Sequence, residues 1–395
     1  VDSKTSKQIQ SDVYQEVNAS RHFSSKHAKS FQPPLAHFDR EELKIGKLVG
    51  KGTFSEVYEL ESIDVNTRFH SFFRSKAYKL NRRKTSLRSN KLLSNGSHPF
   101  VVKHLRPSLV EKQSDFRHAA TELLLEAYYL ASFSHPNIIS VQAVAAKGAK
   151  AYSEGFYDAF FIVMDRVEIT LSDKMEQWKT LSVSLSDRIE IIESLASAAA
   201  YLHHLYIIYR DFKPANVGFD MNGNVKLLDF GLIAEIPKGE NKVTNPCGTP
   251  RYMAPECYFG KPYDYKADVY SITVILWEVL AFQRHFNDLN AMDHVHYVLQ
   301  EGAREMVSNN WPEGIRSILN QGWSADPTNR PSMQDTYTRL SREKEKLRQK
   351  EFIDDDNMVR VNVEQQGLHS ESSSGDTQCS EGTEETARFG IRVEI

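Results

Sequence analysis

The chain has 395 residues, of which 40% are hydrophobic and 26% are charged, and its formal net charge is only −3. This composition is typical of a globular chain with a sizeable core, and the near balance of charge excludes the strongly basic classes that bind nucleic acid or membranes through overall charge. Its three cysteines offer neither a disulfide framework nor the spacing of a zinc site, so we expect a reducing compartment, the cytosol or alternatively the nucleus. No apolar run is long enough to cross a bilayer, and we expect no membrane partner.

The first 42 residues are rich in Ser, Lys, Gln and His, and this stretch contains the pair Pro33-Pro34. Their few apolar residues show little periodicity, which is typical of a segment that cannot bury enough surface to fold. We therefore predict a disordered leader at 1–42 and folded sequence from Leu43 onward.

A glycine-rich turn between two short strand-like runs comes next. Gly50 and Gly52 carry no Cβ, so backbone amides at this turn could close over phosphate oxygens. Residues 56–63 are typical of a second strand and not of a helix, and no Ser or Thr follows Gly50-Lys51, so a hairpin lid fits better than a dinucleotide-binding turn or a P-loop. A purely structural turn is the alternative. The predicted nucleotide contacts in this hairpin are Val49, Gly50, Lys51, Gly52, Thr53, Phe54, Ser55, Glu56 and Val57.

Residues 64–97 form a basic insertion in which Asp64 alone opposes a series of lysines and arginines. We interpret it as a solvated loop, with docking of an acidic partner or nucleic acid as the alternative. Strand-like runs at 100–105, 138–145 and 160–167 and a helical run at 122–133 complete a small β-rich lobe, 43–167.

Helical patterns dominate from 168 to 345, notably at 186–204 and 268–281, and predict a larger α-rich lobe. The fold class expected from the two lobes together is α+β. From 346 to 395 the chain becomes acidic and rich in Ser and Glu, which predicts a disordered tail.

The stretch from Tyr209 to Gly231 concentrates groups suited to phosphoryl transfer. That reaction needs a hydroxyl held in line and the charge on phosphate oxygens neutralised, with little covalent help. Asp211 could accept or orient the hydroxyl proton, and Lys213 could lie against the transferring phosphate. Asn216 and Asp229 could supply the hard oxygen ligands that Mg²⁺ prefers. A charged surface loop with an ordinary Asp-Phe-Gly turn is the alternative.

These motifs make residues 43 to about 340 resemble the eukaryotic protein kinase family. The resemblance extends to Gly248–Glu256, which is similar to the end of an activation segment, to Asp268, which is similar to the brace of the catalytic loop, and to Arg330, which is similar to the buried partner of Glu256. It implies a bilobal fold, ATP and Mg²⁺ as cofactors, and a protein substrate. Lys213 and Thr249 follow the serine/threonine pattern, and several stretches of the second lobe look most like the tyrosine-kinase-like group.

The resemblance also implies roles outside the catalytic loop. Lys103 would reach the α- and β-phosphates and pair with Glu126, although by itself a lysine after a strand or a glutamate on a helix normally faces solvent. The further residues placed around the nucleotide are Val101, Met164, Asp165 and Val167. Arg210 would pair with a phosphorylated activation segment, for which Thr244 is the candidate site and an upstream kinase the implied partner; an unmodified Thr244 is the alternative.

Three positions depart from the family pattern: Tyr209 replaces a histidine, Val101 stands where alanine is common, and Gly218 falls where a larger apolar residue usually floors the adenine. None of them removes a catalytic group. The sequence therefore predicts an active serine/threonine protein kinase, with a pseudokinase scaffold as the alternative. A small-molecule kinase is disfavoured by Ala254-Pro255-Glu256 and the long segment before it, which resemble a peptide-docking platform.

Overall fold

The computed structural model describes residues 3–24, 35–64, 87, 99–154, 157–236 and 239–370. Apart from Asp64 and Leu87, the predicted basic insertion lies outside these ranges, and so does the predicted tail beyond residue 370. The chain divides into two units, Val1–Glu345 and Lys346–Ile395, and every site considered below lies in the first.

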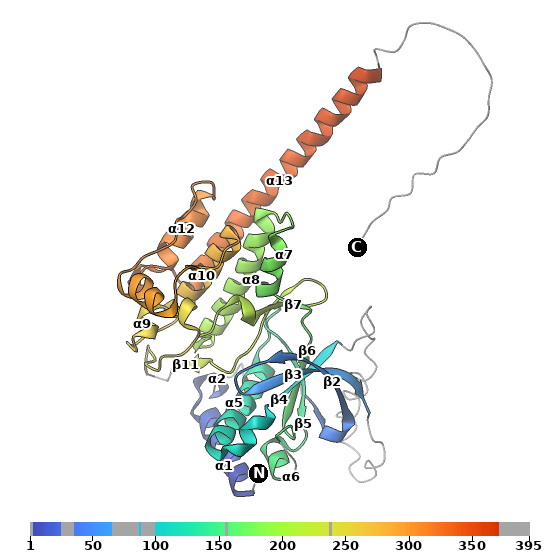
Figure 1. Cartoon of the computed structure of the whole chain (residues 1–395), viewed down its shortest axis with the longest axis vertical. Helices are drawn as coiled ribbons and strands as arrows, with labels where there is room; N and C mark the ends of the chain where they lie inside the picture. The colour runs from blue at the N-terminus through green and yellow to red at the C-terminus, as the bar shows by residue number, and fades with distance from the viewer. Residues whose placement is uncertain are drawn as a thin grey trace, which may run out of the picture. The chain divides into compact units, whose positions relative to one another are not determined.

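A six-stranded sheet forms the first lobe, in the order β1-β5-β6-β4-β3-β2 (Figure 1). Its strands are β1 (Ala36–Phe38), β2 (Leu43–Lys51), β3 (Ser55–Ile63), β4 (Phe100–Leu105), β5 (Val141–Ala145) and β6 (Phe161–Asp165). All neighbours are antiparallel except β1 and β5, which pair in parallel. Strand β4 is buried at every position, because it has a neighbour on each side and side chains packed on both faces.

Helix α5 (Gln113–Ser132) packs on this sheet and follows a 3-10 turn, η3 (Pro107–Glu111). The helix begins nine residues before the helix predicted at 122–133. The prediction began too late because the first turns of the helix are polar and show little apolar spacing. Its buried face includes Phe116, Ala120, Leu123 and Ala127, which recur at helical spacing. This face fixes the rotation of the helix and thereby the direction of Glu126.

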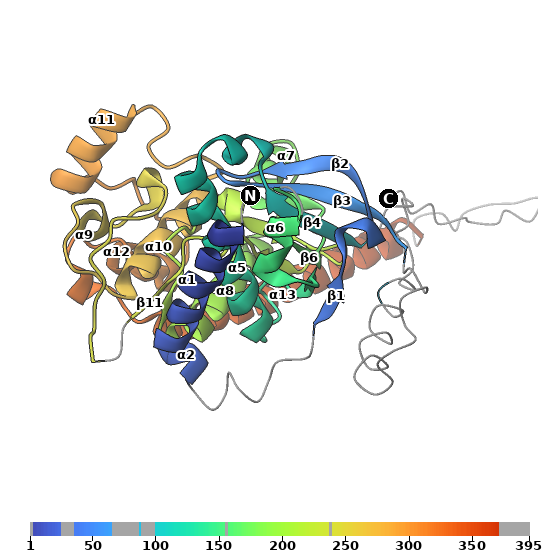
Figure 2. The ribbon, with the colours of Figure 1, turned by 90° about the horizontal axis from the view of Figure 1, so that it is seen from below.

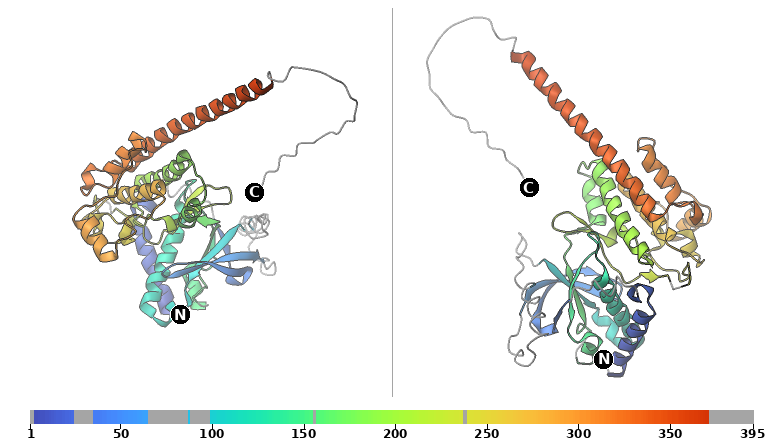
Figure 3. Two further views of the ribbon diagram at one scale, coloured as in Figure 1. Left: turned by 45° about the horizontal axis from the view of Figure 1, so that its top comes forward. Right: turned by 180° about the vertical axis from the view of Figure 1, so that it is seen from behind.

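The prediction of a disordered leader at 1–42 is wrong for much of that segment. Helices α1 (Ser3–Ala19) and α2 (Arg21–Ser24) are formed, and α1 runs beside α5, as Figures 2 and 3 show from several sides. Only Ile9 and Val13 provide an apolar stripe, too little for a composition argument to detect. Polar side chains complete the buried face, since Ser6 Oγ donates to Ala149 O at 2.6 Å.

The second lobe is mostly helical. Its longer helices are α7 (Leu171–Trp178), α8 (Leu185–His204), α10 (Lys266–Ala281), α12 (Glu313–Gly322) and α13 (Met333–Ser370). Shorter elements are β7 (Ile169–Thr170), β8 (Ile207–Ile208), β9 (Val217–Phe219), β10 (Val225–Leu227), β11 (Ala234–Glu235), α9 (Pro255–Tyr258), α11 (Ala291–Asp293) and a π-helical stretch, His294–Gln300. Thr170 and Ser184 cap α7 and α8 by accepting from backbone amides. Helix α10 is buried along nearly its whole length and forms the core of this lobe.

The predicted α+β fold, a β-rich lobe with one main helix followed by a helical lobe, is therefore confirmed. The expectation that the chain is disordered from residue 346 is wrong as far as 370, because α13 continues to Ser370. Lys, Glu, Gln and Arg, which dominate the start of this stretch, are strong helix formers, and no proline interrupts it. Within the described part of the chain, none of the helices has the length and apolar content needed to cross a membrane.

Candidate active site

The ion pair predicted between β4 and α5 is formed. Lys103 Nζ lies 2.7 Å from both carboxylate oxygens of Glu126 and 3.3 Å from Asp229 Oδ1. Lys103 and Glu126 are almost fully buried, with 7% and 4% of their surfaces exposed. The central strand and the helix thus aim two opposite charges at the turn that carries Asp229.

The charges in this cluster favour the ionised forms of Lys103 and Asp229, whereas burial raises the pKa of Glu126. Burial opposes protonation of Lys103, but the charges of Asp229 and Glu126 outweigh it and raise the lysine's pKa above its ordinary value. The charge of Lys103 in turn lowers the pKa of Asp229. A lysine that remains a cation and a carboxylate that remains an anion suit phosphate and metal binding.

Asp211 lies at the centre of a second cluster. Its Oδ2 accepts from Lys213 Nζ at 2.7 Å, and its Oδ1 accepts from Thr249 Oγ1 at 2.6 Å. Lys213 Nζ also donates to Thr249 Oγ1 at 3.0 Å, so the three side chains close a triangle. The carboxylate of Asp211 is thereby fixed in one orientation.

Asn216 is locked against Asp211. Its Nδ2 donates to the backbone oxygen of Asp211 at 3.0 Å and to Oδ2 at 2.8 Å, so both bonds are made by the amide nitrogen and not by Oδ1. Asn216 Oδ1 and the carboxylate of Asp229 are hard oxygen donors of the kind that bind Mg²⁺, so the donor chemistry fits this ion. The described residues include no group of three or more His, Cys, Asp or Glu that could hold a metal unaided. Magnesium is usually bound by one or two side chains together with substrate phosphates, and this pair agrees with that pattern.

Asp268 supports the catalytic loop from beneath. Its side chain is fully buried in α10 and accepts the backbone amides of Tyr209 and Arg210, each at 2.9 Å. Arg210 has a φ of 72°, a left-handed conformation that a non-glycine residue rarely adopts without support. The two bonds to Asp268 hold this turn, which delivers Asp211 to the site.

Aromatic rings connect the catalytic loop to the Asp-Phe-Gly turn. The Tyr209 ring meets Phe230 edge to face at 5.4 Å between centroids, and Phe133 lies 5.6 Å from Phe230. The Tyr209 hydroxyl donates to Leu228 O. Tyr209 therefore has a place in the apolar column and is bonded to the residue that directly precedes Asp229.

Both clusters face one cavity of about 340 Å³ between the lobes. The predicted site residues among its lining are Gly52, Thr53, Phe54, Ser55, Lys103, Glu126, Asp211, Lys213 and Asp229. Residues from the lid hairpin, the central strand, α5 and the catalytic loop, which lie far apart in sequence, thus meet at one place.

The lid is held over this cavity by contacts that the sequence did not reveal. Arg106 Nη1 donates to Thr53 O at 3.1 Å, and its backbone amide donates to Phe54 O at 3.0 Å. Glu56 was predicted among the nucleotide contacts, but its buried side chain accepts from the Tyr58 hydroxyl at 2.7 Å. It lies on the sheet face opposite Val57 because side chains alternate along a strand. Arg106 directly follows β4, which carries Lys103. This closeness in sequence was the available signal that Arg106 lies near the site.

The predicted adenine contacts lie on or beside neighbouring strands. Val57 pairs with Lys103, and Val101 pairs with Met164, so Val57, Val101 and Lys103 point to the same face of the sheet. Asp165 ends β6, and its carboxylate accepts from Gln142 Nε2 at 2.7 Å. In the lid hairpin, Val49 is 46% exposed, and Lys51 Nζ lies 3.8 Å from the carboxylate of Glu56.

Gly218 lies directly against Val167. A Cβ built on Gly218 would lie 2.9 to 3.0 Å from three side-chain atoms of Val167. Val167, in the segment that joins the lobes, therefore occupies the space that a side chain at position 218 would need.

The predicted regulatory pair is not in direct contact in the described structure. Arg210 donates to the backbone oxygens of Leu232 and Ile233 and to the Tyr263 hydroxyl, and none of its hydrogen bonds goes to Thr244. Thr244 is exposed. Tyr263 also donates to Asn245 O at 2.7 Å, so it connects Arg210 to the residue that follows Thr244.

Comparison with known proteins agrees with this geometry. The family description "Protein kinase domain" matches residues 94–339. Mimivirus protein R818 of Acanthamoeba polyphaga mimivirus, named as a serine/threonine-protein kinase/receptor, is 32% identical over 61% of this chain and 14% of its own length. Mitogen-activated protein kinase kinase kinase 7 of Drosophila melanogaster is 28% identical over 61% of this chain and 35% of its own. The proto-oncogene tyrosine-protein kinase ROS of Gallus gallus is 25% identical over 75% of this chain and 12% of its own. The chain thus spans only a minor part of the length of these relatives.

Proposed function

The chain belongs to the protein kinase family, and from this premise we propose that it transfers the γ-phosphate of Mg-ATP to serine or threonine hydroxyls of protein substrates. The observation that carries the proposal is the pair of clusters, Lys103–Glu126–Asp229 and Asp211–Lys213–Thr249, on the walls of one cavity. The first is suited to holding a nucleotide, and the second to presenting a hydroxyl to it.

Each side chain has a task in this mechanism. Asp211 would orient the acceptor hydroxyl and take its proton, and the bonds from Thr249 and Lys213 hold the carboxylate ready. Lys213 would also neutralise charge on the transferring phosphate, while Lys103 would neutralise the α- and β-phosphates. Asn216 and Asp229 would hold Mg²⁺, which supplies charge neutralisation on the phosphate oxygens when bound. The glycine turn at 50–52 would close over the phosphates.

A groove beside Asp211 supports a polypeptide acceptor. It has a volume of about 860 Å³ and is lined by residues that include Lys213, Thr249, Tyr252, Glu278 and Arg284. A groove of this size continues well beyond the transfer site, which favours a chain over a small alcohol. The bond between Lys213 and Thr249 supports serine or threonine as the acceptor, and the mimivirus relative described above carries the name of a serine/threonine-protein kinase. The tyrosine-kinase-like placement, the cytosolic location and activation by an upstream kinase at Thr244 remain predictions.

A pseudokinase scaffold is the second candidate. The departures that favour it are Tyr209, Gly218 and Ser55, which takes the third position of the lid turn, a departure that many kinases share. Tyr209 keeps the aromatic column, however, and Gly218 is matched by Val167. The closed Lys103–Glu126 pair favours the active enzyme.

The test is phosphate transfer from Mg-ATP to a general Ser/Thr protein substrate by the parent chain and by Asp211→Asn. We expect the variant to lose about a hundredfold or more in rate, since one preorganised transition-state group is removed. Asp326→Asn is the matched control, because it makes the same change at an exposed carboxylate that caps a 3-10 turn in the second lobe. An active parent whose rate is unchanged by Asp211→Asn would refute the assignment, and a parent that binds ATP without transfer would favour the scaffold.

A further inference from the structure

The segment formed by α1 and α2 contacts two elements next to the site. It packs on α5, which carries Glu126, and it bonds to Glu235 of β11, six residues after Asp229. We infer that residues Ser3–Ser24 are a built-in activating partner that holds α5 and β11 in the arrangement required for catalysis. This inference rests on the proposed phosphotransfer function and concerns its regulation.

The first contact is between α1 and the N-terminal half of α5. Ile9 and Val13 are buried, with 0% and 4% of their surfaces exposed. Arg117 of α5 pairs with Asp12 at 3.1 Å, and Gln113 Nε2 donates to Thr5 Oγ1 at 2.6 Å. These contacts join α1 to α5 through both apolar and polar groups, as expected of a specific docking surface.

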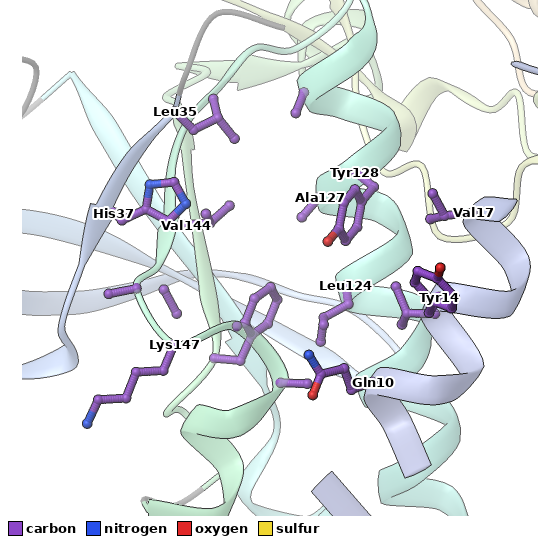
Figure 4. A pocket seen from close by; sticks show the side chains of 17 residues that line it. Gln10, Tyr14, Val17, Leu35, His37, Leu124, Ala127, Tyr128, Val144 and Lys147 are labelled. Carbon is purple, nitrogen blue, oxygen red and sulfur yellow. The ribbon is translucent and has the colours of Figure 1, made fainter. Parts of the chain in front are cut away.

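A cavity of about 500 Å³ lies farther along the same two helices, and its lining includes Tyr14 and Val17 of α1 and Leu124 and Tyr128 of α5 (Figure 4). The contact between α1 and the rest of the lobe is thus incompletely filled in its middle. It depends on the packed and hydrogen-bonded groups at its two ends, and a single substitution at either end should loosen it.

The second contact collects three donors on one carboxylate of β11. Ser20 Oγ donates to Glu235 Oε2 at 2.5 Å, the His22 amide donates to Oε1 at 2.6 Å, and the Tyr129 hydroxyl of α5 donates to Oε2 at 3.3 Å. Glu235 therefore ties α2, α5 and β11 together. Strand β11 pairs with β8, Ile207–Ile208, three residues before Asp211. The N-terminal segment is thus joined to both chain segments that enter the active site.

A third connection passes through aromatic rings. His22 is buried, with Nε2 2.7 Å from Ser132 Oγ, and its ring lies 5.6 Å from that of Phe133. Phe133 lies 5.6 Å from Phe230, whose backbone amide donates to Glu126 Oε1 at 3.2 Å. The contact chain from α2 thus reaches the glutamate that holds Lys103.

These contacts are expected to favour the catalytically competent arrangement. Catalysis needs Glu126 turned toward Lys103 and Asp229 turned into the cavity. Glu126 belongs to α5, which the N-terminal segment contacts, and Asp229 lies five residues before β11, which the segment also contacts. A segment that binds only this arrangement shifts the equilibrium toward it. Loss of the segment's contacts should therefore lower the fraction of competent enzyme without touching a catalytic residue.

The test uses the full-length chain with Ile9→Glu, which places a charge in the docking face of α1. Gln15→Glu is the matched control, because it adds the same charge at an exposed position of the same helix. Amide hydrogen exchange reports on α5 and β11 without requiring activity, and phosphate transfer is measured in parallel. We expect exchange in both elements to rise by about tenfold or more in Ile9→Glu, with a similar fall in transfer rate, and no change in the control.

Ser20→Ala is the second variant, since it removes one bond to Glu235, together with the bond that Ser20 Oγ accepts from the Phe23 amide, and leaves the apolar face of α1 intact. This variant tests the inference if Ile9→Glu fails to fold. We expect amide hydrogen exchange in β11 to be faster in Ser20→Ala than in the parent, as in Ile9→Glu. Unchanged exchange in α5 and β11 in the folded variants would overturn the inference, whatever their activity. If the parent transfers no phosphate but exchange is still faster in the variants, the contact between the N-terminal segment and α5 and β11 is supported and the proposed kinase function is refuted. Failure of the inference and failure of the proposed function therefore give different results.

Discussion

Thr249 donates a 2.6 Å hydrogen bond to Asp211 Oδ1, the carboxylate oxygen that does not bind Lys213. The segment that precedes Ala254-Pro255-Glu256 thus reaches back to orient Asp211, which we propose as the catalytic base, and it does so through a hydroxyl with the same chemistry as the proposed acceptor. A substrate hydroxyl near Asp211 would meet a carboxylate already positioned by this bond.

Thr249→Ala should lower kcat because Asp211 loses one of the groups that orient it. We expect a fall of about tenfold to a hundredfold, within the range for a positioned acid–base group. Thr249→Ser keeps the hydroxyl and is the matched control, with activity near that of the parent. Steady-state kinetics on a protein substrate measures both, and equal activity in the alanine and serine variants would show that the bond has no catalytic role.

Substitutions at Lys103 and Glu126 should have strongly non-additive effects on the free energy of unfolding. Lys103→Met leaves a buried carboxylate without its main partner, and breaking a buried pair from one side commonly lowers the free energy of unfolding by about 3–5 kcal/mol. Adding Glu126→Gln removes the uncompensated charge and should recover a large part of that loss. Chemical unfolding of the parent, both single variants and the double variant completes the cycle, and additive effects would contradict the coupling.

Much of the catalytic core could be predicted from the sequence because its residues have fixed local spacing. Asp211, Lys213 and Asn216 lie on one short loop, and the structure joins them by hydrogen bonds as that spacing suggested. Thr249 was noted only as part of a substrate-type pattern. Its bond to Asp211 spans 38 positions, and no local pattern encodes such a contact.

The N-terminal helix shows the opposite case. Two apolar residues and a polar composition predicted disorder, whereas α1 is stabilised by tertiary contacts with α5 and with Ala149 O. Short helices in proteins obtain most of their stability from packing, which only the folded partner surface can supply. The composition argument likewise could not show that the alternation of strand β3 turns the Glu56 side chain to the face opposite Val57.

Gly218→Ala should destabilise the protein because the new Cβ would overlap Val167. Overpacking of this kind typically lowers the free energy of unfolding by about 1–3 kcal/mol. Val167→Ala removes two of the three opposing atoms, Cγ1 and Cγ2, so the double variant should be more stable than Gly218→Ala alone and should bind ATP more tightly. Thermal unfolding and nucleotide titration measure the two effects, and a double variant no better than the single one would exclude Val167 as the opposing group.

Glu278 should make stability depend on pH in a direction opposite to that of most carboxylates. Burial raises its pKa to about 7, against hydrogen bonds from the His285 amide and the Tyr252 hydroxyl that favour the ionised form. The unfolded chain ionises this group near its ordinary pKa of 4.5, so the folded state becomes less favoured as pH rises from about 4.5 to about 7.

Glu278→Gln removes this titration. Relative to the parent, the variant should gain stability between pH 5 and pH 8, by up to about 3 kcal/mol. Unfolding at several pH values measures this difference. A constant difference between variant and parent across that range would show that Glu278 ionises normally in the folded state. Asp326→Asn, at an exposed carboxylate, serves as a control without this dependence.

The antiparallel pairing of β3 with β4 has a consequence for engineering. Ser55 pairs with Leu105 beside the glycine turn, so Ile63 and Phe100, which flank the long connection, lie toward the opposite end of the hairpin. The entropy of closing a loop grows only slowly with its length. This connection is therefore a suitable entry point for a reporter domain or an affinity tag, because its length can change greatly while the strands that carry Lys103 and the lid keep their register.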